Sequence, residues 1–205
     1  MATFIALGES LICKGETTKE QLFKLCEEKG YCKLNDDIYS ECANFLFYTS
    51  WFEELLFNND DRQSPKKLKK ICSDLTDANQ GYAIKLAQFD FYGDYFSQRY
   101  LNSDNSVKHA FNQLRIPKEF EDEVKASLIA YKDNRERNSC LLWTYLMITY
   151  RFRNNMFHGA KGLINLSNYL RVLRMINQFM YMLLDHILET RYCGYNQKRI
   201  AFKTW

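Results

Sequence analysis

The chain has 205 residues, of which 46% are hydrophobic and 16% aromatic, and it contains only 2 prolines and 8 glycines. A chain of this length and composition can bury the core of one domain, which excludes disorder over most of its length. So few turn-forming residues also exclude a sandwich of many short strands, and the composition therefore predicts an all-α protein.

The formal net charge of +3 is distributed unevenly along the chain. Residues 1–134 contain 17 Lys and Arg against 22 Asp and Glu, a balance of −5, whereas residues 135–205 contain 11 against 3, a balance of +8. A basic terminal third suits a polyanion such as RNA, or an anionic membrane surface. A solvated basic face is the alternative interpretation.

The seven cysteines show no CxxC pair and no Cys/His spacing of a zinc site, which predicts free thiols in a reducing compartment. No basic region precedes the short apolar patch at residues 1–12, so we expect no secretory signal. No stretch reaches the roughly 18 to 20 uninterrupted apolar residues that span a bilayer. We therefore expect a soluble, cytoplasmic protein with no membrane partner.

Helix-start and helix-stop signals divide the chain into a series of helices. Thr17 and Glu20 have the spacing of a capping box, and Ser64-Pro65 is a cap followed by proline at the first helical position. The boundaries are weakest from Asp77 onward, where two glycines interrupt the pattern. The expected helices are 18–29, 38–57, a short basic helix from residue 65, 77–101, 106–114, 117–131, 140–157 and 166–192, with a solvated loop at 132–139.

The last two expected helices differ from the others. The helix at 140–157 is apolar almost all round as far as Tyr150, as expected of a helix buried at the centre of a domain. The helix at 166–192 repeats apolar residues close to helical spacing. We therefore divide one domain, 1–205, into N-terminal helices at 1–135, a motif-bearing helical pair at 136–192 and a basic tail at 193–205.

The central helix ends in the run Arg-Phe-Arg-Asn-Asn-Met-Phe-His, residues 151–158. Side chains three, four or seven positions apart share one helix face, and four of them form a polar stripe here: Arg151, Asn154, Asn155 and His158. Arg153 lies about 140° around the axis from His158, at about 100° per residue. An arginine side chain is long enough for both heads to reach one phosphate.

RNA cleavage by its own 2′-hydroxyl needs a base, an acid and positive charge on the phosphorane. His158 suits the acid or base role, because the helix dipole at a C-terminus favours its protonated form, and Asn154 one turn earlier would orient its ring. Arg153 would stabilise the phosphorane. The predicted RNA and phosphate contacts behind them are Arg151, Asn155 and Lys161. The alternative role of Arg151 is that of a structural ion-pair partner.

This scheme requires no metal and no other cofactor. The acidic residues nearest to the motif in sequence are Glu136 and Asp185, and they form no carboxylate cluster beside it that would hold magnesium.

The segment Arg153-Asn154-Asn155-Met156-Phe157-His158 resembles the Arg-x4-His motif of the HEPN superfamily, in which a polar residue follows the arginine near the end of a helix in an all-α domain. Gly159 after the histidine is similar to many bacterial members. It departs from the tyrosine usual in the toxins of this superfamily that are paired with nucleotidyltransferases.

The resemblance implies a metal-independent endoribonuclease, often a toxin or antiviral effector, that leaves a 2′,3′-cyclic phosphate. It also implies a homodimer in which two motifs face one cleft, so that two copies supply the acid and the base. An antitoxin or a sensor is the further partner expected of such effectors. Two alternatives are a non-catalytic HEPN module that binds RNA or a nucleotide or assembles a complex, and an unrelated helical adaptor.

Overall fold

The computed structural model describes residues 18–28, 35–57, 64–157 and 168–195. Over these residues it contains helices and no strand, which confirms the predicted all-α class. Within the same residues, none of the helices combines the length and the apolar character needed to cross a bilayer.

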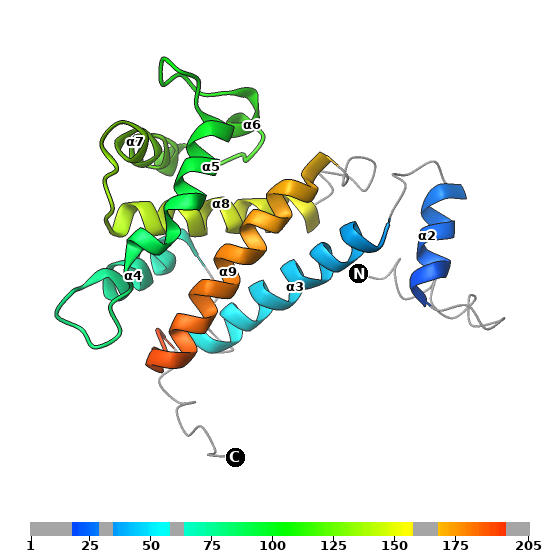
Figure 1. The fold of residues 1–205 in the computed structure, drawn as a ribbon, viewed down its shortest axis with the longest axis horizontal. Coiled ribbons are helices and arrows are strands. Elements are labelled where there is room, and N and C mark those ends of the chain that lie inside the picture. Colours follow the sequence, from blue (N-terminus) through cyan, green and yellow to red (C-terminus); the bar gives the residue numbers. More distant parts are fainter. Residues whose placement is uncertain (1–17, 29–34, 58–63, 158–167, 196–205) are drawn as a thin grey trace.

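The described helices follow one another along the chain and are labelled in Figure 1. They are α2 (Thr18–Glu28), α3 (Asp36–Leu56), α4 (Pro65–Thr76), the 3-10 helix η1 (Leu86–Phe89), α5 (Asp90–Tyr100), α6 (His109–Asn112), α7 (Lys118–Asn134), α8 (Ser139–Phe157) and α9 (Leu170–Thr190).

Helix α8 forms the centre of the molecule, as its apolar sequence predicts. Every residue from Leu141 to Thr149 is buried, and α4 and α7 both pack against this helix. The ring of Tyr145 meets Phe179 of α9 edge to face, with 5.6 Å between the ring centres. The one polar atom of the Trp143 side chain is also satisfied, since the indole N–H donates to the carbonyl of Pro65 at 3.0 Å.

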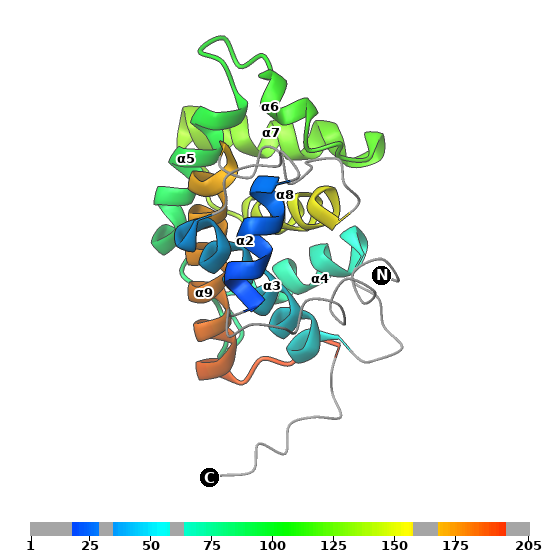
Figure 2. The ribbon, with the colours of Figure 1, turned by 90° about the vertical axis from the view of Figure 1, so that its right-hand side faces the viewer.

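Helices α3 and α9 lie side by side and run in the same direction (Figure 1). Their contacts advance together along both helices: Asn177 donates to the Glu41 carbonyl at 2.9 Å, and four residues further on Tyr181 meets Tyr48 with 6.2 Å between ring centres. Helix α2 lies near the start of α3 (Figure 2), and the ring centres of Phe23 on α2 and Tyr39 on α3 are 5.9 Å apart.

Two predicted helix starts are confirmed, and the second of them shows its predicted cap. The predicted first helix begins at Thr18, directly after Thr17, and the Ser64 hydroxyl accepts the backbone N–H of Lys67 at 3.3 Å. The predicted helix at 77–101 is wrong in its first half. The Asp77 carboxylate accepts the backbone N–H of Asn79 at 3.0 Å, which closes a turn in place of a helix, so α5 begins only at Asp90.

Three other predicted boundaries also differ from the structure. Helix α7 continues to Asn134, into the predicted loop at 132–139, and stops where Arg135 takes the left-handed conformation with φ of 55°. Of the predicted helix 106–114 only the single turn α6 forms. Helix α9 begins at Leu170, four residues later than expected.

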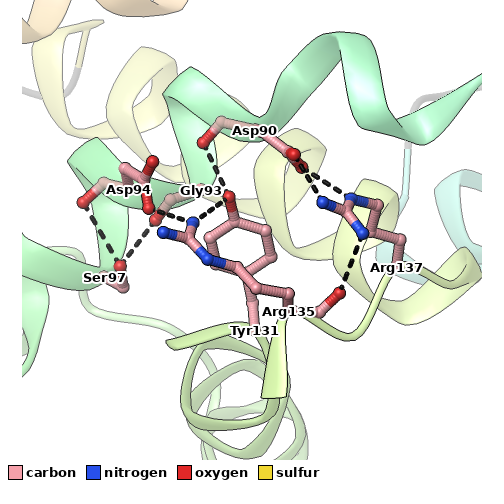
Figure 3. Close-up of polar contacts among 7 residues, drawn as sticks. All are labelled: Asp90, Gly93, Asp94, Ser97, Tyr131, Arg135 and Arg137. Atoms are coloured by element: carbon pink, nitrogen blue, oxygen red, sulfur yellow. Dashed lines mark hydrogen bonds and ion pairs between the residues drawn. The ribbon is translucent and has the colours of Figure 1, made fainter. Parts of the chain in front are cut away.

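A polar cluster joins the start of α5 to the connection between α7 and α8 (Figure 3). Arg137 donates two hydrogen bonds to the Asp90 carboxylate, at 2.7 and 2.5 Å, and these hold the pKa of Asp90 below its usual value. One terminal nitrogen of Arg135 donates to the Asp94 carboxylate and also contacts the Tyr131 hydroxyl, at 2.6 Å. The Tyr131 hydroxyl donates to the Asp90 carbonyl at 2.8 Å, so the cluster fixes where α8 begins.

Gly93 allows this close approach, because a Cβ atom there would lie 2.5 Å from both the Tyr131 ring and the Tyr145 hydroxyl. We expect Gly93→Ala to lower the free energy of unfolding by about 1 to 3 kcal/mol, since overpacking two buried rings outweighs the roughly 1 kcal/mol that alanine gains in a helix. Denaturant unfolding measures the difference.

Gly81→Ala is the matched control. No atom lies within 4 Å of a Cβ placed at Gly81, so we expect its effect to stay within about 0.5 kcal/mol. A Gly93→Ala protein as stable as the wild type would contradict the account of this approach.

Candidate active site

The predicted motif lies at the end of α8, in the last turns of the buried central helix. His158 and Lys161 lie outside the described residues, so their predicted roles stay predictions. Residues 151–156 are described with their side chains, and they point to different neighbours.

Arg153 points to α3 and forms a two-pronged ion pair with Glu53. Its two terminal nitrogens each donate to one carboxylate oxygen of Glu53 at 2.9 Å, and the two side chains are 27% and 29% exposed. Burial raises the pKa of Glu53 against the attraction of Arg153. The guanidinium is therefore fixed in direction, in the geometry with which arginine also binds phosphate.

Apolar packing beside this pair explains why the two helices meet there. Phe152 precedes the arginine and is fully buried, and its ring stands edge to face with Phe45 of α3, 5.9 Å between centres. Phe45 lies eight residues before Glu53, about 80° around the axis at about 100° per residue, so both lie on the side of α3 that faces α8. The aromatic contact thus aligns Glu53 with Arg153.

Asn155 and Arg151 point the other way, to the segment between α6 and α7. The Asn155 amide donates to the carbonyls of Gln113 and Leu114 at 3.1 and 3.0 Å, and the side chain is only 3% exposed. The Arg151 Nε atom donates to the same Leu114 carbonyl at 3.2 Å. Both residues tie α8 to this segment, and their predicted contacts with RNA stay predictions.

The predicted polar stripe and Arg153 therefore contact different neighbours. Asn154 is half-buried beside Asn155, and no hydrogen bond of its side chain to another described residue is recorded. Arg153, placed beside the stripe by the sequence analysis, is directed to α3, and Arg151 and Asn155 to the chain before α7. Among the described residues, Glu53 is the acidic side chain that contacts the motif.

Glu53 is not among the site residues predicted from the sequence. A signal was present, because Glu53 and Glu54 are the only charged residues between Cys42 and Phe57. An acidic pair in an otherwise apolar helical segment needs a partner. The sequence alone does not say that the partner stands 100 residues further along, at Arg153.

The other two histidines have hydrogen-bond partners away from the motif. His186 bonds to the Tyr82 carbonyl at 2.8 Å and His109 to the Gln113 amide at 3.0 Å. No three His, Cys, Asp or Glu side chains gather into a metal site in the described part of the chain. Three described cysteines are free thiols, as predicted: Cys72, Cys140 and Cys193.

Comparisons with models of known protein families, with curated proteins and with solved structures found no match to this chain.

We expect Asn155→Ala to lower the free energy of unfolding by about 1 to 3 kcal/mol, because it removes two hydrogen bonds of a buried side chain, to the Gln113 and Leu114 carbonyls. Thermal or denaturant unfolding measures the loss. Asn154→Ala removes the same side chain one position earlier, and we expect it to change stability by about 0.5 kcal/mol or less. Equal losses in the two variants would show that the bonds of Asn155 contribute nothing specific.

Proposed function

We propose that this protein is a HEPN-type, metal-independent endoribonuclease. One observation carries the proposal: a half-buried guanidinium, held in two-pronged geometry on the last turns of a buried helix, stands five residues before a histidine in an all-α domain. The Arg-x4-His spacing, the place at a helix end and the fold class agree with the resemblance.

In the proposed reaction, the RNA 2′-hydroxyl attacks the adjacent phosphorus and the 5′-oxygen leaves. Arg153 neutralises the charge of the phosphorane, and His158 transfers a proton as acid or base. Asn154 orients His158. The products are a 2′,3′-cyclic phosphate and a free 5′-hydroxyl, and no metal takes part.

The proposal extends to the partners that the resemblance implies. RNA is the substrate, a second copy of the chain brings a second motif to the cleft, and an antitoxin or a sensor controls activity. A toxin or an antiviral effector is the cellular role that fits such a nuclease.

A second candidate function is a non-catalytic HEPN module that assembles a complex. It is favoured by large apolar side chains that α3, α5 and α9 leave exposed: Phe47 at 60%, Phe91 at 64% and Tyr181 at 55%. Such side chains suit contact with another protein. An Arg153 held by Glu53 also fits a module that never releases it to a phosphate.

Incubation of purified protein with cellular RNA in excess EDTA tests the proposal. We expect cleavage by the wild type that leaves cyclic phosphate ends, and a rate lower by about 10² to 10⁴ in His158→Ala, the scale of a lost acid-base group. Arg153→Ala should lose a similar factor, because the phosphorane charge is then unopposed.

Lys69→Ala is the control for a general loss of basic charge, since Lys69 lies on α4 and pairs with Glu123 at 2.5 Å. We expect it to cleave like the wild type. RNA binding without cleavage by the wild type would favour the assembly or binding module.

A further inference from the structure

Cleavage through the 2′-hydroxyl needs two proton-transfer groups, but the motif of one chain contains one histidine. The other two histidines are at a distance in sequence and bond elsewhere: His109 to the Gln113 amide and His186 to the Tyr82 carbonyl. A second group within the chain therefore has to be sought among other side chains.

Glu53 is the acidic side chain that contacts Arg153 in the described part of the chain. Its two oxygens contact the two terminal nitrogens of Arg153 at 2.9 Å. A phosphate oxygen bound to the same guanidinium at about 2.8 Å would stand within about 5 Å of the carboxylate. The 2′-hydroxyl next to that phosphate can then come within hydrogen-bond reach of Glu53.

We propose that Glu53 is the general base of the reaction, an assignment that rests on the proposed function. An oxygen of Glu53 takes the proton of the 2′-hydroxyl while the 2′-oxygen forms its bond to phosphorus. The bond from phosphorus to the 5′-oxygen breaks, and His158 donates a proton to that oxygen. Afterwards Glu53 returns its proton to solvent and His158 regains one.

The surroundings of Glu53 suit a base. Burial raises its pKa, and Arg153 is the one charged group of the described residues that acts against this rise. A higher pKa makes a carboxylate a stronger base and leaves it ionised at neutral pH as long as the pKa stays below 7. Arg153 also compensates the negative charge that Glu53 and a phosphate would bring together.

With Glu53 as the base, a dimer is no longer needed to complete one active site. If Glu53 is the base and His158 the acid, each chain carries both groups. A dimer then holds two complete sites, whereas a site with one histidine from each copy needs both chains for every cleavage.

The test is the pH dependence of kcat/KM for RNA cleavage by the wild type and Glu53→Gln. Glutamine has nearly the same shape and still accepts a hydrogen bond from Arg153, but it takes no proton. We expect a loss of about 10² to 10⁴ at neutral pH and the disappearance of the acid limb of the profile. The wild type should lose activity as the pH falls through the raised pKa of Glu53.

Asp37→Asn is the matched control, because Asp37 lies on the same helix and pairs with an arginine, Arg174, at 3.0 Å. It should leave rate and profile unchanged. Glu53→Asp keeps a carboxylate on a shorter side chain, so it should lose rate but retain the acid limb. Circular dichroism and thermal melting report the folding of each variant.

Several results would overturn the assignment. A faster Glu53→Gln protein would mean that Glu53 competes with phosphate for Arg153, and a slower one with an intact acid limb would leave Glu53 only a positioning role. Should Glu53→Gln not fold, Glu53→Asp at the full wild-type rate would decide against it. Recovery of activity on mixing Glu53→Gln with His158→Ala would show that the two groups come from different copies, and it would overturn the claim that each chain carries a complete site.

A wild type that cleaves no RNA would overturn the proposed function itself, and the base assignment would fall with it. Failure of the base assignment alone leaves wild-type cleavage and its dependence on His158 intact.

Discussion

The structure depends on the burial of α8. A helix with every residue from Leu141 to Thr149 buried cannot rotate or slide without opening the core that it shares with α4, α7 and α9. Its last turns are therefore held in register with their neighbours. Arg153 meets α3 on one side, and Asn155 meets the Leu114 carbonyl on the other. The apolar helix is what positions the polar motif.

The ion pair at the end of α8 is poorly explained by stability alone. The pKa of Glu53 is raised, which means that the loss of hydration on burial exceeds the stabilisation that Arg153 gives its charge. Replacing such a pair by apolar side chains often leaves a protein equally stable or more stable. A half-buried carboxylate on a fixed guanidinium is more consistent with chemistry, where a raised pKa and a directed cation are both useful.

Local signals in the sequence predicted the all-α class, the central helix and most helix starts. Ser64 before Pro65 is such a signal, since capping depends on the nearest few residues. The prediction of a helix start at Asp77 was wrong, because an aspartate side chain can close a turn as readily as it can cap a helix. The partners of the motif could not be predicted from local sequence. Helical spacing places Arg151 and Asn155 on one face of α8, but the contacts of that face with Leu114, and of Arg153 with Glu53, depend on how distant segments pack.

The uneven charge along the chain has a structural use. Acidic residues of the first 134 pair with arginines of the basic third: Asp90 with Arg137, Asp94 with Arg135, Glu53 with Arg153, and Asp37 and Glu41 with Arg174. The acidic and basic parts of the chain therefore contact each other in the fold. These paired arginines present less net charge to solvent than the sequence suggests. Under the proposed function, recognition of RNA would rest less on a general basic surface and more on the site at Arg153, where a phosphate would share the guanidinium with Glu53.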